Sequence, residues 1–189
     1  LLVAPVIISG VLRRRAFVAW ASVHDLEFAI SRGPRDWSKS SARAQTVYGR
    51  WMGKLVRCEC VETGAGRWSN DWLLVCLSLG SPLPAGMILE AGSELPRLET
   101  IQLRRVTSGV EEFDRAFSCY ARNASAKVVL ADPAFQLALV ACRANAVALR
   151  AFESRLEVVT NAGRHTRHPP TERIGQLFDA VASVEVALE

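Results

Sequence analysis

The chain opens on twelve uncharged residues, LLVAPVIISGVL, and then carries Arg13, Arg14 and Arg15 in succession. A bilayer core requires about 20 apolar residues in a helix that rises about 1.5 Å per residue. The run is too short for a complete span, so we expect upstream residues to complete it. The positive-inside rule would place the three arginines, as a membrane flank, in the cytoplasm. Residues 1–28 therefore predict a truncated transmembrane or membrane-proximal helix.

Two other interpretations of this run are weighed against the anchor. A signal peptide fits poorly, because its charges precede the apolar core and a small-residue cleavage site follows it. An ordinary buried strand or helix would also accommodate twelve apolar residues. The helical spacing continues over residues 14–28, where Phe17, Trp20, Ala21 and His24 fall near one face. This continuation favours one helix that extends from the membrane into the following domain.

Short strands are predicted by the pattern that follows. Residues 45–61 alternate in part, residues 68–79 are rich in apolar and aromatic side chains, and ETGAGR between them supplies two glycines for a turn. The segment GSPLPAGM predicts a loop, since its prolines would interrupt a central strand. Further strands are predicted at residues 88–89, 100–106 and 116–120, and a hairpin joins residues 146–152 to 155–160.

Helices are predicted near the end of the chain. Asp132 and Pro133 are a typical N-cap and first helical residue, and the apolar residues that follow predict a largely buried helix. A second helix begins near Pro170, with an apolar stripe formed by Ile174, Leu177, Phe178, Val181, Val184 and Leu188.

The order of these elements predicts an α+β fold, in which antiparallel sheet is packed by helices and preceded by the membrane-proximal helix. Residues 29–189 would form this α+β domain. It would divide into two β-rich halves, if there are two, near residues 82–92.

The charge distribution along the chain predicts an anionic membrane surface as a binding partner. Residues 1–57 hold ten Lys or Arg against three acidic residues, whereas the remainder of the chain is slightly acidic. Basic residues beside an apolar N-terminus suit an anionic lipid surface, and the inner or plasma membrane, with the domain on its cytoplasmic side, is the expected location. Nucleic acid, bound through residues 32–57, is a weaker alternative, because the chain has no zinc-finger spacing and no RNA-recognition signature.

The five cysteines have no regular spacing, which argues against a disulfide framework and favours a reducing compartment. Cys58 and Cys60 would share one face of a strand, but a structural zinc site requires four ligands and no second pair exists. We expect neither metal nor cofactor. An enzyme of unrecognised type, with its site near Cys58 and Cys60 or in the acidic cluster described next, is the main alternative to a non-catalytic module.

The acidic cluster lies in the segment SGVEEFDRAF. Glu111, Glu112 and Asp114 could form a ligand site. The more conservative interpretation is a turn in which Asp114 bonds to nearby backbone amides while Phe113 and Phe117, one helical turn apart, anchor it in the core.

Several of these segments together resemble a family of uncharacterised bacterial membrane-anchored proteins, which have a short N-terminal span and a cytoplasmic α+β domain. The matching features are the arginines at 13–15, residues 24–28, Tyr48-Gly49-Arg50 and the segment 108–117. The resemblance implies no known activity. With no catalytic motif found, the sequence favours a membrane-anchored interaction or regulatory module that binds a protein partner.

Overall fold

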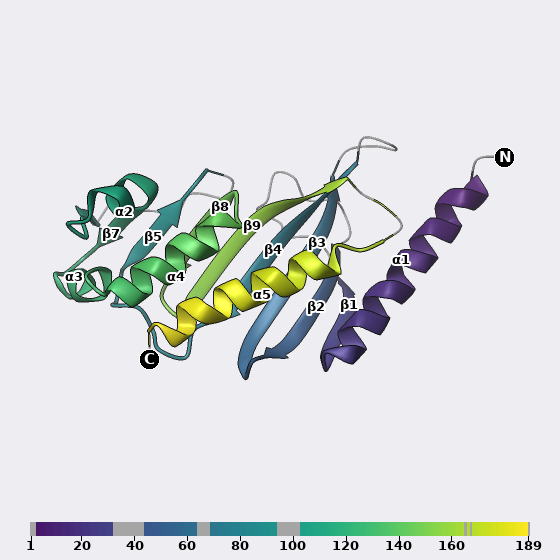
Figure 1. The fold of residues 1–189 in the computed structure, drawn as a ribbon, viewed down its shortest axis with the longest axis horizontal. Coiled ribbons are helices and arrows are strands. Elements are labelled where there is room, and N and C mark those ends of the chain that lie inside the picture. Colours follow the sequence, from purple (N-terminus) through teal and green to yellow (C-terminus); the bar gives the residue numbers. More distant parts are fainter. Residues whose placement is uncertain are drawn as a thin grey trace.

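In the described part of the chain, nine strands form one antiparallel sheet at the centre of the protein (Figure 1). The computed structural model describes residues 3–31, 44–63, 69–93, 103–164, 166 and 168–188. The strands are β1 (Leu26–Ser31), β2 (Ala44–Trp51), β3 (Lys54–Thr63), β4 (Asn70–Ser78), β5 (Ile88–Ala91), β6 (Arg104–Val106), β7 (Ser118–Ala121), β8 (Ala148–Phe152) and β9 (Arg155–Arg164). The helices are α1 (Val3–Val23), α2 (Glu111–Ala116), α3 (Ser125–Leu130), α4 (Pro133–Ala144) and α5 (Thr171–Val186).

The strand order is β1-β2-β3-β4-β9-β8-β5-β7-β6. The first four strands follow one another as hairpins, and β8 and β9 form another hairpin. The two groups join where β4 pairs with β9, with Asn70 opposite Arg164 and Ser78 opposite Arg155. The segments on either side of residues 82–92 therefore belong to the same sheet. The predicted α+β class and antiparallel sheet are confirmed.

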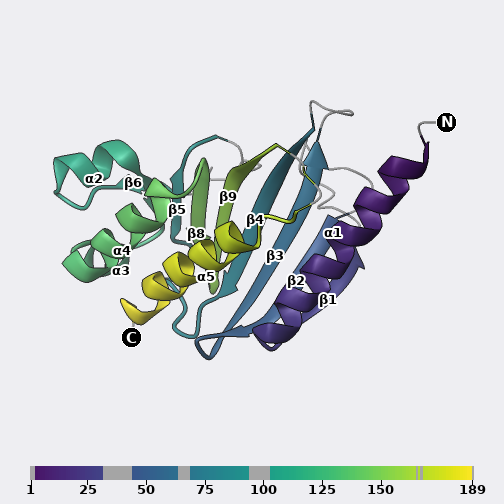
Figure 2. The same cartoon turned by 45° about the vertical axis from the view of Figure 1, so that its right-hand side comes forward.

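Helices α1, α4 and α5 cover one face of this sheet (Figure 2). The apolar core lies between them and the strands, because alternate strand residues point to this face. Helix α5 crosses β2, β3, β4 and β9, while α1 lies over the β1 end and its first turns extend past the sheet. The N-terminus and C-terminus consequently lie at opposite ends of the molecule.

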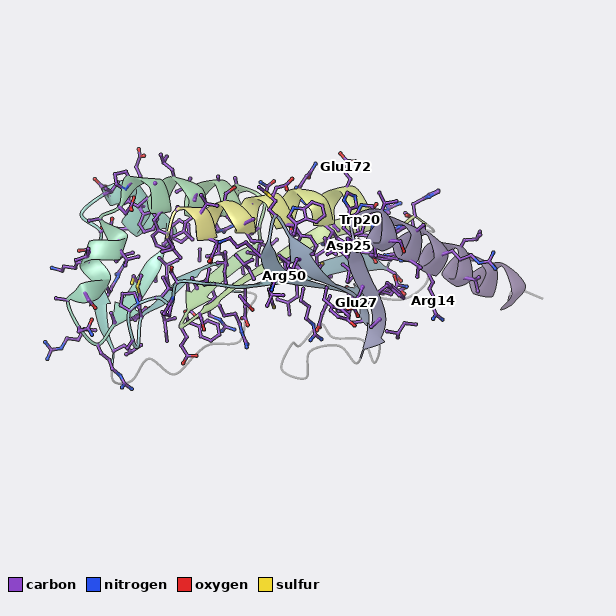
Figure 3. All side chains as sticks on the ribbon, turned by 90° about the horizontal axis from the view of Figure 1, so that it is seen from below. Arg14, Trp20, Asp25, Glu27, Arg50 and Glu172 are labelled. Carbon is purple, nitrogen blue, oxygen red and sulfur yellow. The ribbon has the colours of Figure 1, made fainter. Side chains whose placement is uncertain are left out.

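Among the described residues, no long helix packs on the opposite face of the sheet, which we call the helix-free face. Figure 3 shows Glu172 of α5 on the helical side and Glu27 of β1 on the other. A small apolar cluster of Ala44, Val61, Ala148 and Val159 is buried on this second face, with Trp72 and Leu74 packed beside it. Charged and polar side chains occupy much of the remaining surface on this side, as described below.

Helices α4 and α5 test the sequence predictions for the last part of the chain. In α5, Ile174, Leu177, Phe178, Val181 and Val184 are all buried, as predicted. Asp132 caps α4 by accepting hydrogen bonds from the backbone N–H of Ala134 and Phe135, also as predicted. The expectation that α4 is largely buried is wrong, because Leu137 is 70% exposed. Helix α4 packs against α5 and the common core with one face only, and leaves Leu137 and Val140 exposed on the other.

Several predicted boundaries need correction. Residues 26–28 belong to β1 and not to a helix, since Asp25 takes a left-handed φ of 55° and turns the chain back on α1. Residues 45–61 form two strands, because Met52 and Gly53, with φ of 51° and 80°, make a tight hairpin turn. The short helix α3 has no counterpart in the predicted elements. The predicted turn at residues 64–68 lies outside the described residues.

The hairpin of β8 and β9, the short strand β5 and the loop at residues 80–87 agree with the sequence pattern. Within the described part of the chain, no helix has both the length and the apolar character needed to cross a bilayer.

Gly92 gives a direct test of the packing between β5 and β8. Its φ is +80°, and a Cβ atom there would lie 2.3 Å from the carbonyl oxygen of Val147. We expect Gly92→Ala to lower the free energy of unfolding in urea by more than the 1–3 kcal/mol, roughly, that left-handed strain alone costs. Gly163→Ala is the matched control, since Gly163 has a φ of +93° and open space around it. Equal losses in the two variants would contradict the close approach.

Candidate functional site

The three consecutive arginines of α1 separate into two environments. Arg13, predicted with its neighbours to flank a membrane, is only 2% exposed and points into the domain. Its guanidinium lies 2.7 Å from a carboxylate oxygen of Asp71 on β4 and donates to the carbonyl oxygens of Thr166 and His168, at 2.6 and 3.1 Å. The same guanidinium nitrogen that meets Asp71 lies 3.4 Å from the sulfur of Cys60. Arg13 thus ties α1 to the sheet and to the segment that precedes α5.

Asp71 occupies an irregular position in the sheet. The register between β4 and β9 shifts between Asp71 and Trp72, which marks a bulge. The Asp71 side chain lies on the helical face, is 3% exposed and meets Arg13 there. A buried ion pair depends on both partners, because a remaining single charge would be poorly solvated.

An aromatic cluster makes a second attachment for α1. The rings of Trp20 on α1 and Trp51 on β2 stack with centroids 6.2 Å apart, and His24 contacts both. Trp51 also packs on Phe178 of α5 and donates a hydrogen bond of 2.8 Å to Asp179. The C-terminal half of α1 is therefore fixed to both the sheet and α5.

The outer face of α1 combines apolar and basic side chains. Val11, Leu12 and Val18 are between 41% and 47% exposed. Arg14 and Arg15 are exposed among them, and Figure 3 shows Arg14 pointing away from the sheet. A shallow depression of about 410 Å³ is lined by Val11, Arg14, Arg15, Val18 and Ala19. We call these five residues and Leu12 the α1 outer face.

A row of mostly polar side chains crosses the helix-free face of the sheet. Successive strands place its members directly opposite one another: Glu27, Tyr48, Arg57, Cys76, Glu157, Arg150, Glu90 and Ser118. Tyr48 donates a 2.6 Å hydrogen bond to Glu27, and Arg150 lies 2.5 Å from Glu157. We call this set the polar row. Its charged members, three Glu and two Arg, alternate in sign along it.

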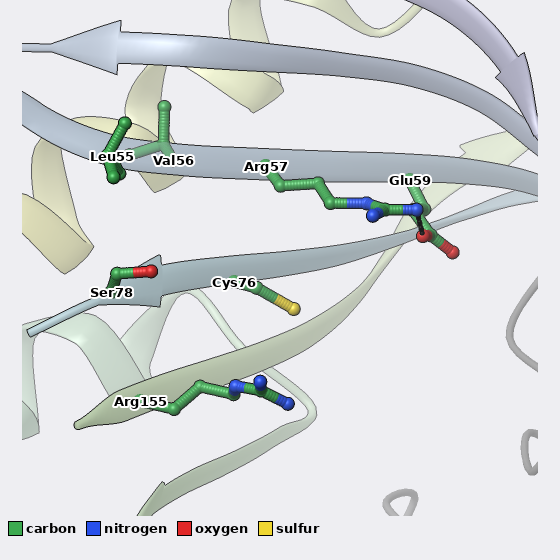
Figure 4. A pocket seen from close by; sticks show the side chains of 7 residues that line it. All are labelled: Leu55, Val56, Arg57, Glu59, Cys76, Ser78 and Arg155. Carbon is green, nitrogen blue, oxygen red and sulfur yellow. Dashed lines mark hydrogen bonds and ion pairs between the residues drawn. The ribbon is translucent and has the colours of Figure 1, made fainter.

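A groove of about 380 Å³ lies at the middle of the polar row (Figure 4). It is lined by Leu55, Val56, Arg57, Glu59, Cys76, Ser78 and Arg155. Figure 4 shows Cys76 of β4 between the guanidinium groups of Arg57 on β3 and Arg155 on β9. The Arg57 guanidinium lies 2.5 Å from one oxygen of Glu59, and the other oxygen of Glu59 is buried without a hydrogen-bond partner among the described residues.

The cysteines named as candidate nucleophiles or ligands lie in the core. Cys58 and Cys60 share the helix-covered face of β3, as the alternation of a strand predicts, and both are buried. Burial raises the pKa of the Cys58 thiol well above its usual value and raises the pKa of Cys60 to about 12. Burial likewise raises the pKa of Cys76 to about 12. At neutral pH these thiols are protonated and poorly nucleophilic.

The acidic cluster at the start of α2 is engaged in local structure. Asp114 accepts hydrogen bonds from the backbone N–H of Ser108 and Gly109, and these bonds lower the pKa of its carboxyl group although desolvation opposes them. Glu111 pairs with Arg115 one turn along the helix, and Glu112 is exposed. The rings of Phe113 and Phe117 stack at 4.6 Å behind this turn. Within the described residues, no group of three or more His, Cys, Asp or Glu side chains could hold a metal ion.

The groove and the ion pair of Arg13 with Asp71 were not predicted from the sequence. Alternation in β3 predicts that Arg57 and Glu59 share one face. The groove also needs side chains from β4 and β9, and these two strands pair although they are far apart in the sequence. The basic segment at residues 32–43 lies outside the described residues; Arg50 and Arg57 of the same proposed nucleic-acid surface lie on the helix-free face.

Comparisons with known proteins inform the fold only. No protein-family model matches the chain, and a search of curated proteins gives no significant match. Among solved structures, the crystal structure of the mycobacterial trehalose monomycolate transport factor A, TtfA, is similar with a TM-score of 0.53 and 12% sequence identity. The alignment covers 94% of each chain. At this identity the likeness shows a shared fold over nearly the whole chain.

Arg13→Met should reduce the free energy of unfolding by roughly 3–5 kcal/mol, because it leaves the Asp71 carboxylate buried without its guanidinium. Urea denaturation measures this loss. Arg14→Met is the matched control and should change the free energy by less than about 0.5 kcal/mol, since Arg14 is exposed. The double variant Arg13→Met with Asp71→Leu should recover part of the loss. If Arg13→Met lowers the free energy of unfolding no more than Arg14→Met does, the buried ion pair of Arg13 with Asp71 is refuted.

The raised thiol pKa values predict slow alkylation. At pH 8 a thiol with a pKa of about 12 has roughly a thousandfold less thiolate than one at the usual value of 9.0. We therefore expect Cys76 to react with iodoacetamide at least about a hundredfold more slowly in the native protein than in urea-unfolded protein at this pH. Peptide mass spectrometry over time measures both rates, and comparable rates would show that Cys76 is an available nucleophile.

Proposed function

We propose that this chain is a non-catalytic module that works against the cytoplasmic side of the inner or plasma membrane, where it binds lipid through α1 and engages a protein partner. The α1 outer face is the observation on which this proposal rests. It presents apolar side chains together with Arg14 and Arg15, which is the composition that anionic bilayer surfaces attract. The uncharged residues from Val3 to Leu12 form the first half of this helix, whose first turns extend past the sheet.

The inward position of Arg13 supports the same proposal. Its charge is compensated by Asp71, so Arg14 and Arg15 are the two members of the arginine cluster that are exposed to lipid. Because Arg13 and Trp20 fix α1 to the domain, a membrane bound by the outer face would hold the whole domain in one orientation. The helix would then hold the sheet at a fixed distance and orientation relative to the bilayer.

The fold likeness to a transport factor suggests the process in which such a module would serve. We propose an accessory role in the transport of an amphiphilic molecule, in which this chain positions or regulates a membrane-bound partner. The buried, protonated thiols of Cys58 and Cys60 and the locally engaged Asp114 favour this accessory role over catalysis at those residues.

Vesicle co-sedimentation tests the membrane contact. The chain should bind vesicles that contain phosphatidylglycerol and bind phosphatidylcholine vesicles much less. Arg14→Gln combined with Arg15→Gln should weaken the binding by about thirtyfold, since each basic side chain near an anionic surface contributes roughly 1 kcal/mol.

The matched control is Arg104→Gln combined with Arg105→Gln, because these are also consecutive exposed arginines but lie on β6 at the far end of the sheet. This control should bind as the unaltered chain does. Equal weakening in both double variants would indicate attraction by overall charge and would refute a site on α1.

A further inference from the structure

The groove on the helix-free face has the properties of a built ligand site, separate from the α1 outer face. Its floor is the rigid sheet, because β3, β4 and β9 contribute its side chains in fixed register. The Glu59 side chain lines it and is only 9% exposed, with one carboxylate oxygen lacking a hydrogen-bond partner among the described residues. A buried acceptor in this state favours any ligand that brings a donor to it.

The groove also holds donors that face solvent. The side chains of Arg57 and Arg155 are 52% and 61% exposed, and each uses part of its guanidinium on a neighbouring carboxylate, Glu59 and Glu157 respectively. A guanidinium has five N–H donors, so donors remain for a ligand. The Ser78 hydroxyl at the same wall is able to donate and to accept.

Charge balance narrows the class of ligand. Arg57 and Arg155 line the groove together with one carboxylate, Glu59. The ion pairs continue beyond the lining to Glu157, Arg150 and Glu90, and the three guanidinium groups and three carboxylates of this network balance in charge, so neither an anion nor a cation gains much attraction there. An added peptide strand is disfavoured, because the groove lies on the face of the sheet and not at an edge. The Cys76 thiol, with its pKa of about 12, supplies no thiolate for covalent capture at neutral pH.

We propose that this groove binds a neutral polyhydroxylated group, such as a hexose unit, through Arg57, Glu59, Ser78 and Arg155. Hydroxyl groups fit this site because each donates and accepts, and so satisfies a carboxylate and a guanidinium at once. The hexose could be a free saccharide or the headgroup of a glycolipid. Leu55, which is 51% exposed at the groove, offers an apolar surface for the alkyl part of the latter.

The test is a titration of the ¹⁵N-labelled chain, observed by two-dimensional NMR, with methyl α-D-glucopyranoside and separately with inorganic phosphate. Saturable shifts of the Arg57, Cys76 and Arg155 amides with the glucoside, without such shifts from phosphate, are the expected result. Saturation by phosphate alone would show an anion site and overturn the proposal. So would a lack of saturable shifts at these amides with either probe.

Variants assign the binding to the groove. Arg155→Gln should weaken glucoside binding about tenfold, the usual effect of losing one hydrogen bond from a charged group. Arg164→Gln is the control, since Arg164 is also exposed on β9 but lies at its other end, outside the groove. Equal affinity in the two variants would overturn the assignment. Hexyl glucoside, below its micelle concentration, should bind more tightly than the methyl glucoside if the natural source is a glycolipid and equally if it is a free saccharide.

The result of the glucoside titration does not depend on whether the chain binds membranes. The vesicle experiment depends on Arg14 and Arg15 of α1, and the titration depends on strands at the other face of the sheet. Loss of one result therefore leaves the other interpretable.

Discussion

A buried ion pair between Arg13 and Asp71 determines how the N-terminal helix relates to the rest of the molecule. The guanidinium and carboxylate meet at 2.7 Å with almost no exposure, and the same guanidinium serves the carbonyl oxygens that precede α5. Such a pair contributes little over an apolar contact of equal volume, but its geometry is specific because either charge alone is costly. It therefore fixes the position of α1 on the sheet more than it adds stability.

The position of α1 has consequences for both faces of the protein. On the helical face, Phe17 and Trp20 continue the core to the β1 end of the sheet, where α5 would not reach. On its outer side, the same helix exposes Arg14, Arg15 and several valines. The helix-free face of the sheet is left for the polar row and its groove. The apolar core, the α1 outer face and the polar row therefore all follow from one sheet that carries its helices on one side.

Local patterns in the sequence predicted much of this fold. The Asp132 N-cap, the apolar stripe of α5 and the hairpin turn at Glu153 depend on neighbouring residues, and these agree with the structure. The turn at Met52 and Gly53 is not predicted because it lies inside the partly alternating run of residues 45–61, which has no cluster of turn-forming residues to divide it. The exposure of α4 was misjudged because apolar residues lie around the whole helix, while the fold buries only one face.

The sites were harder to predict, since they depend on pairings between distant strands. The helical spacing of Phe17 and Ala21 places Arg13 on the buried face of α1, but the sequence does not show its partner, because Asp71 lies on β4, far along the chain. Similarly, Cys76 becomes the centre of a groove because β9 pairs with β4 some eighty residues further along the chain. The composition at residues 111–114 favours a ligand site, but the structure gives Asp114 and Glu111 local partners.

Hydrogen exchange of the α1 amides is the most direct test of the central claim, that α1 is an integral part of the domain held by Arg13. The account predicts that the backbone amides of residues 17–21 exchange as slowly as those of β4, by global unfolding, and that Asp71→Asn accelerates the helix much more than the sheet. Fast exchange of α1 in the unaltered chain, with β4 still protected, would show that the helix is not fixed to the sheet and would contradict the account.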